Sequence, residues 1–253
     1  MGQLDGKVAI VTGAGRGIGR AIALLFGQEG AKVAAISRTK ETLEATVREI
    51  AEAGGTAIAI QCDVTSKEQI DTAVAATIDA FGTVHVLVNN AHDRKGQQSP
   101  FMQTDEAGFQ QQFATGLFST VHFMQTCYPF LKANEGNVIN FASGAGVLGA
   151  YGFTPYAAAK EAIRGVSRVA AREWAADKIN INIICPTSMT DALEDAIKDP
   201  GVLEIVSRTP LGIPGSPLKE VAPVALFLAT DASSYITGHS FHVDGGNLMD
   251  AGR

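Results

Sequence analysis

Two reactive side chains lie four residues apart in the segment TPYAAAK, which runs from Thr154 to Lys160. On a helix this spacing places Tyr156 and Lys160 on one face, because residues at i and i+4 are neighbours. An ammonium close to a phenol favours the phenolate, so such a pair could transfer protons. The same spacing also arises by chance on ordinary helices, so the pair alone does not establish a catalytic site.

A serine upstream strengthens the catalytic interpretation. Ser143 directly follows the apolar run NVINFA at 137–142, which is predicted to be a strand. Ligands of doubly wound parallel sheets bind at the carboxyl ends of the strands. Ser143 is therefore expected at the ligand-binding edge of such a sheet.

The elements that would position these residues alternate along the chain. Short apolar, β-branched runs are separated by amphipathic segments such as 41–55, a pattern typical of a parallel sheet covered by helices. We predict an α/β fold with a doubly wound, seven-stranded parallel sheet and helices on both faces. The predicted strands are 8–12, 32–37, 56–62, 84–89, 137–142, 181–185 and 239–243.

Composition excludes several classes of protein. With 46% hydrophobic and 18% charged residues, the chain is expected to be a soluble globular protein, and no linker divides residues 1–253 into more than one domain. The net charge of -6 and the absence of a basic run argue against a nucleic-acid partner. Apolar runs near the amino terminus are too short for a signal or a membrane span. Isolated Cys62, Cys127 and Cys185 suit a reducing compartment, so we expect a cytoplasmic protein.

One segment departs from the regular alternation. Residues 187–218 contain Pro200, Pro210, Pro214 and Pro217 around two short helical pieces. An insertion after a strand at the ligand-binding edge suits a substrate lid, although a plain surface loop is the alternative.

A glycine-rich loop follows the first predicted strand and opens the first helix. Glycines allow a tight turn and a close approach of a pyrophosphate to backbone amides, and the helix amino terminus favours anions. Turn glycines are common, but the position between strand and helix indicates a dinucleotide site. The expected cofactor contacts in the loop are Gly13, Gly15, Arg16, Gly17, Ile18 and Gly19.

The end of the second strand indicates which dinucleotide binds. A carboxylate there would bind the 2'-hydroxyl of NAD, but this chain has Ser37 and Arg38, with Arg16 in the glycine loop. A guanidinium matches the oxygens of a phosphate, so we predict NADP(H). The alternative is that both arginines are solvated surface residues.

Further motifs follow in order along the chain. They are CDV at 62–64, NNA at 89–91, ICP at 184–186, ITG at 236–238 and VDGG at 243–246. With the glycine loop and with Ser143, Tyr156 and Lys160, they make the sequence resemble the short-chain dehydrogenase/reductase family over essentially its whole length, close to the 3-oxoacyl-reductase-like members. The resemblance implies a single-domain Rossmann fold and NADP(H)-dependent interconversion of a ketone and a secondary alcohol by hydride transfer.

The resemblance also implies roles for the reactive residues. Tyr156 would be the acid in reduction and the base in oxidation, Ser143 would hold the carbonyl oxygen, and Lys160 would bind the nicotinamide ribose and lower the tyrosine pKa. Moving a phenol pKa from about 10 to about 7 requires roughly 4 kcal/mol. One ammonium about 4 Å away at an effective dielectric near 20 supplies about that much.

Other cofactor contacts are implied in the same way. Asp63 and Val64 match the contacts to adenine, Asn90 matches the asparagine on the ribose side, and Met189 falls where the backbone meets the carboxamide. Each of these could instead be a turn or core residue.

The sequence departs from the family pattern at three positions. His92 and Thr187 replace glycines, and Gly116 replaces the helix asparagine that keeps a water-mediated proton path from the lysine. Water could fill the vacated volume, Thr115 or His92 could substitute, or catalysis could be weak. We prefer an active enzyme with an altered relay, and we assign His92 no catalytic role.

No metal site is expected, because His239 and His242 lack partners at ligand spacing. The expected substrate is an apolar or aromatic ketone, since the cleft would be lined by Val147, Leu148, Tyr151, Phe153, Met189 and Leu193. The alternative is that these side chains only support the fold.

Small residues of the helix that begins near Tyr156 suggest a symmetric assembly. Because the family commonly pairs such helices, we expect a homotetramer, although small residues also pack inside a monomer. These residues are Ala157, Ala158, Ala159, Ala162 and Gly165. Two other functions stay open: a catalytically weak NADPH-binding regulator, and a non-redox epimerase or dehydratase with the same Tyr and Lys.

Overall fold

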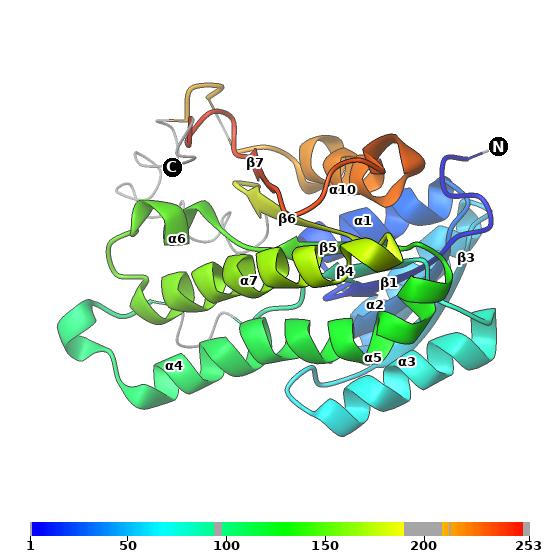
Figure 1. The fold of residues 1–253 in the computed structure, drawn as a ribbon, viewed down its shortest axis with the longest axis horizontal. Coiled ribbons are helices and arrows are strands. Elements are labelled where there is room, and N and C mark those ends of the chain that lie inside the picture. The colour runs from blue at the N-terminus through cyan, green and yellow to red at the C-terminus, as the bar shows by residue number, and fades with distance from the viewer. Residues whose placement is uncertain (1, 94–97, 190–208, 213, 250–253) are drawn as a thin grey trace.

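The computed structural model describes residues 2–93, 98–189, 209–212 and 214–249. Within these residues seven parallel strands form one sheet, in the order β3-β2-β1-β4-β5-β6-β7 (Figure 1). The predicted doubly wound parallel sheet is therefore confirmed. The strands are β1 (Val8–Thr12), β2 (Lys32–Ser37), β3 (Thr56–Gln61), β4 (Val86–Asn89), β5 (Asn137–Phe141), β6 (Asn180–Pro186) and β7 (Ser240–Val243).

Helices cover both faces of the sheet. The α-helices are α1 (Gly17–Gln28), α2 (Lys40–Glu52), α3 (Lys67–Phe81), α4 (Glu106–Gln112), α5 (Ser119–Ala133), α6 (Gly144–Leu148), α7 (Thr154–Glu173) and α10 (Ala222–Ala229). Short 3₁₀ turns are η1 (Phe101–Gln103), η3 (Ala175–Asp177) and η5 (Asp231–Ser233), and π-helical turns are η2 (Phe113–Phe118) and η4 (Pro217–Val221). Helices α1 and α10 pack on one side, and α3, α5 and α7 on the other (Figure 1).

The core consists of two apolar layers, one on each face of the sheet. Neighbouring residues of a strand point to opposite faces, so Val11 packs with Phe26 of α1 while Ile10 packs with Phe123 of α5. Every residue of β1 is buried for this reason. Burial on both faces explains why the strand sequences are continuously apolar rather than alternating.

The order of the strands reverses between β1 and β4. The chain runs outward from β1 through β2 to β3, then crosses to β4 on the other side of β1. Connections on the two sides of this point diverge, which leaves a crevice at the carboxyl ends of the strands where such sheets bind ligands. The glycine loop follows β1 and the NNA motif spans the end of β4, so both lie at this crevice.

The predicted lid at 187–218 falls mostly outside the described residues, which omit 190–208 and 213. Its described ends are close in space, because Met189 N donates to Gly215 O at 2.8 Å. Among the described helices, none is long and apolar enough to cross a membrane.

Candidate active site

At Gly13 and Gly19 the glycine loop is packed too closely to admit a side chain. Gly13 has φ of 69°, and a Cβ there would lie 2.7 Å from Asn90 Nδ2. A Cβ on Gly19 would lie 2.3 Å from the carbonyl oxygen of Gly13. Glycine at these positions lets the loop turn sharply and lets α1 start directly against the loop.

The amino terminus of α1 is open to an anion. Arg16 precedes the helix in an extended conformation, no side chain caps the first turn, and that turn contains no acidic residue. The first backbone N–H groups of a helix lack partners within the helix and carry partial positive charge. The residues present therefore fit the pyrophosphate of a dinucleotide.

Thr12 and Asn90 join the glycine loop to the end of β4. Thr12 Oγ1 accepts hydrogen bonds from the backbone N–H groups of Asn90 and Ala91, at 2.9 and 3.0 Å. Asn90 Nδ2 donates to Thr12 O at 2.9 Å. This bond uses one of the two N–H groups of the Asn90 amide, so a ribose contact from its side chain, as the resemblance implies, would use the other N–H group or Oδ1.

Of the two arginines expected to select the cofactor, only Arg38 forms a salt bridge with the described residues. Arg38 Nη2 forms a salt bridge with Asp93 Oδ2 at 3.0 Å, whereas no salt bridge joins Arg16 to any part of the described chain. Asp93 was not anticipated from the sequence, because 55 residues separate it from Arg38. The pair leaves further N–H donors of the Arg38 guanidinium for a phosphate.

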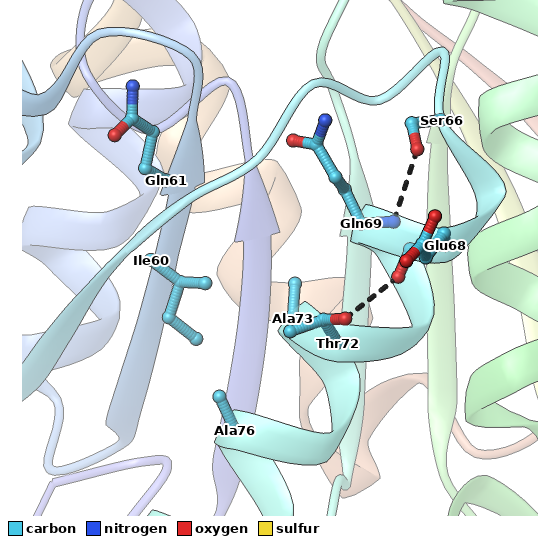
Figure 2. Close-up of a pocket in the computed structure, with 8 residues that line it drawn as sticks. All are labelled: Ile60, Gln61, Ser66, Glu68, Gln69, Thr72, Ala73 and Ala76. Atoms are coloured by element: carbon cyan, nitrogen blue, oxygen red, sulfur yellow. Dashed lines mark hydrogen bonds between the residues drawn. The ribbon is translucent and has the colours of Figure 1, made fainter.

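The segment after β3 is held by local hydrogen bonds. Asp63 Oδ1 accepts from Thr65 N at 3.0 Å and from Thr65 Oγ1 at 2.9 Å, and Val64 is buried in the core. Beside this segment, a groove of about 340 Å³ lies between β3 and α3, with Gln61 and Gln69 among its lining residues (Figure 2). The predicted catalytic residues do not line this groove, so we do not assign it to the reaction.

The structure brings Ser143, Tyr156 and Lys160 together. Ser143 caps α6 at the end of β5, accepting from Ala145 N at 3.2 Å, and its hydroxyl is near enough to the Tyr156 phenol to lower the phenol pKa. Lys160, buried one turn further along α7, donates to Phe141 O at 2.9 Å. Its Nζ lies 5.6 Å from the centre of the Tyr156 ring. A hydroxyl, a phenol and an ammonium therefore converge at the carboxyl-terminal edge of the sheet, where the crevice lies.

The pKa of Tyr156 differs from the expectation. Burial raises it above the ordinary value, the neighbouring Ser143 hydroxyl opposes this rise, and Cys185 adds to it. Burial also lowers the pKa of Lys160, to about 8. Lys160 does not lower the pKa of Tyr156 as expected, because desolvation disfavours the charged form of both groups. In this structure Tyr156 is thus a protonated phenol at neutral pH.

The volume left by the missing helix asparagine contains an imidazole. Gly116 lies in the π-helical turn η2 between α4 and α5, and a Cβ there would lie 2.9 Å from Nδ1 and Cε1 of His92. The ring of His92 meets Tyr156 edge-on, with ring centres 5.2 Å apart. Oε1 of Gln112 lies 2.7 Å from Nε2 of this ring and holds it in place, a contact that was not predicted from the sequence. Gln112 precedes Gly116 by four residues, and this helical spacing could have predicted that Gln112 lies beside the same volume.

These features define a class: an α/β oxidoreductase whose dinucleotide site and reactive hydroxyl groups share one edge of a doubly wound sheet. A family model described as enoyl-(acyl carrier protein) reductase matches residues 13–247. The 12alpha-hydroxysteroid dehydrogenase of Clostridium sp. is 39% identical over 97% of this chain and 98% of its own length. The 3-oxoacyl-(acyl-carrier-protein) reductase FabG of Thermotoga maritima is 36% identical over 98% of this chain and 100% of its own length.

Solved structures agree with this class. A 7 alpha-hydroxysteroid dehydrogenase in complex with NADH and 7-oxo glycochenodeoxycholic acid superposes with a TM-score of 0.92 and 33% identity, covering 98% of this chain and 97% of that chain. Levodione reductase gives a TM-score of 0.91 at 30% identity, covering 96% of this chain and 98% of its own. The chain belongs to the short-chain dehydrogenase/reductase family.

Proposed function

We propose that this protein is an NADP(H)-dependent enzyme that interconverts a ketone and a secondary alcohol, with Tyr156 as the acid and base. The observation that carries the proposal is the convergence of Ser143, Tyr156 and Lys160 at the ligand-binding edge of the sheet. When the dinucleotide is bound with its pyrophosphate at the glycine loop, its nicotinamide supplies or accepts the hydride.

The chain's own groups manage the proton. The raised pKa keeps Tyr156 protonated near neutral pH, which is the form that donates to a carbonyl oxygen during reduction. Ser143 is positioned to hold that oxygen, because its hydroxyl already contacts the phenol. Lys160 is cationic below its pKa of about 8, and it stabilises the phenolate that remains after the proton has left.

Cofactor preference is expected to depend on Arg16 and Arg38. The variant Arg16→Ala/Arg38→Ala should lower kcat/KM with NADPH by about 10- to 100-fold and leave kcat/KM with NADH unchanged, because a charged hydrogen bond contributes roughly 1.5–3 kcal/mol. Arg20→Ala is the matched control, since Arg20 is paired with Glu49. Steady-state kinetics with both cofactors measure this, and a wild-type preference for NADH of about tenfold or more would contradict the NADP(H) assignment.

The predicted substrate is a bulky apolar ketone or its alcohol. Segments 98–104 and 148–153 lie side by side, because Ser99 N donates to Gly152 O at 2.7 Å. They expose Phe101, Met102, Leu148 and Tyr151 at 78, 91, 56 and 93%. Phe153 joins this apolar rim to Tyr156, with ring centres 5.9 Å apart. Leu193, predicted to line the same cleft, lies outside the described residues.

The relatives named above suggest which compounds to test. Oxo- and hydroxysteroids, 3-oxoacyl thioesters and small aromatic ketones would be incubated with NADPH or NADP, and the nicotinamide absorbance followed. We expect turnover with a steroid-sized apolar substrate and none with small charged ketones. Cofactor binding without turnover on any member of the panel would instead support a regulator.

Assembly and location are further parts of the proposal. Four of the small residues of α7 are partly exposed, namely Ala157, Ala158, Ala162 and Gly165, whereas Ala159 is buried in its own chain. A Cβ added at Gly165 would meet nothing within 4 Å among the described residues. We expect a homotetramer by sedimentation velocity and smaller species for Gly165→Arg, whereas a monomeric wild type at micromolar concentration would contradict this. Three free, buried cysteines are consistent with the cytoplasm, and recovery of the protein outside it on cell fractionation would contradict that location.

A further inference from the structure

His92 contains a buried nitrogen that receives no hydrogen bond from the described residues. Its Nε2 lies 2.7 Å from Gln112 Oε1, while Gln112 Nε2 donates to Asp93 O at 3.2 Å. The glutamine oxygen is thus an acceptor, so Nε2 of His92 carries the proton. Nδ1 is then a bare lone pair that is enclosed and receives no donor from the described part of the chain. Such a group is costly in a folded protein unless a donor reaches it.

Nδ1 of His92 lies within the candidate active site. The nitrogen lies over Gly116, and the same ring contacts Tyr156 by its edge. Burial is the main cause that lowers the pKa of His92 to about 3, and the charge of Lys160 is the next. His92 is therefore a neutral acceptor, and it shares a neighbour with the Lys160 ammonium, whose Nζ lies 5.6 Å from the centre of the same Tyr156 ring.

The ammonium of Lys160 has N–H donors that make no hydrogen bond to the described residues. Among the described residues it makes one hydrogen bond, to Phe141 O, whereas an ammonium has three donors. Nearby alternatives to His92 are engaged within their own helix. Thr115 Oγ1 donates to Gln111 O at 2.9 Å, and the carbonyl oxygen of Gly116 accepts from Thr120 Oγ1 at 2.8 Å.

We propose that His92 is a positioning residue of this site, with Nδ1 accepting from a bridging water that also receives a hydrogen bond from Lys160. This connection would hold the ammonium against Tyr156 and link it toward solvent. The inference rests on the proposed function. Because His92 stays neutral, it orients the hydrogen-bonded chain and is not itself protonated.

The first test removes the acceptor and keeps the ring. His92→Phe should lower kcat by about 10- to 100-fold, as expected for a lost hydrogen bond to a charged group, and should shift the pH profile of kcat. Its affinity for NADPH, measured by cofactor fluorescence, should stay within about twofold of wild type. His122→Phe is the matched control, because its buried Nδ1 also has no partner among the residues that the structure describes, but it lies outside the site on α5. The control should keep both kcat and the profile.

The second test exchanges the two residues. Gly116→Asn alone should lose activity, because its Cβ would lie 2.9 Å from the His92 ring. His92→Gly alone should lose activity for lack of the acceptor. The combined variant His92→Gly/Gly116→Asn should recover kcat to within about threefold of wild type, because an amide oxygen then replaces Nδ1. This exchange decides the question if His92→Phe does not fold.

A spectroscopic measurement is independent of turnover. Nitrogen NMR of the imidazole should show a protonated Nε2 and an unprotonated Nδ1 between about pH 5 and 8. A protonated Nδ1, a wild-type rate and pH profile in His92→Phe, or no recovery in the combined variant would overturn the inference. These failures differ from failure of the proposed function, in which the wild type itself turns over no carbonyl or alcohol substrate.

Discussion

Replacing Tyr156 with phenylalanine is expected to lower kcat for ketone reduction by about 10³-fold or more, because positioned acid–base catalysis contributes roughly 10²–10⁴-fold. The substitution removes the hydroxyl that contacts Ser143 and leaves the ring that packs against His92 and Phe153. Folding and NADPH affinity should therefore be little changed. Single-turnover absorbance and cofactor fluorescence measure the two quantities separately.

Tyr128→Phe is the matched control for this substitution. Tyr128 also has a bonded hydroxyl, 2.6 Å from Asp177 Oδ2, but it lies on α5 and packs against Trp174. We expect removal of this hydroxyl to lower stability only slightly, because the hydrogen bond is open to solvent, and to leave kcat unchanged. If Tyr156→Phe kept activity like this control, another group would have to be the acid.

Replacing Gly19 with alanine is expected to weaken NADPH binding by about 100-fold. The added Cβ would lie 2.3 Å from the Gly13 carbonyl oxygen and 2.4 Å from Asn90 Nδ2, so the loop must move away from β4. Such overpacking typically costs 1–3 kcal/mol, about 5- to 150-fold in an equilibrium constant, and here it falls on the backbone that would hold the pyrophosphate. Cofactor fluorescence titration measures the affinity, and thermal unfolding measures the stability.

Gly27→Ala separates binding from stability. Gly27 lies in the same helix, and its added Cβ would lie 2.6 Å from Ile50 Cγ2, a side-chain atom away from the glycine loop. This variant should change the melting temperature without changing NADPH affinity. Equal losses of affinity in both variants would mean that the packing of α1, rather than the loop, determines cofactor binding.

The sheet and the glycine loop were predictable because their signals are local. Strands covered on both faces are apolar at every position, so β1 and β2 were predicted with their observed boundaries. The glycines follow directly after β1, and their spacing indicates a tight turn before any contact is known. The proximity of Ser143, Tyr156 and Lys160 followed from their placement after β5 and on α7.

The arrangement around Gly116 could not be predicted in the same way. The sequence showed that an asparagine was missing, but the occupant of its volume depends on how the chain after β4 packs against the helix that contains η2. His92 fills that volume from a position 20 residues before its partner Gln112. The raised pKa of Tyr156 likewise depends on burial, which the spacing of two residues on a helix does not reveal.

The central claim is hydride transfer between the nicotinamide and a carbonyl carbon, with the proton supplied by Tyr156. The most direct measurement uses NADPH deuterated at C4 of the nicotinamide on each face in turn, a ketone substrate from the panel, and mass spectrometry of the product. We predict one deuterium on the carbinol carbon from one face, none from the other, and no product from Tyr156→Phe. Product without deuterium while the cofactor stays unconsumed would contradict the account and indicate a non-redox reaction.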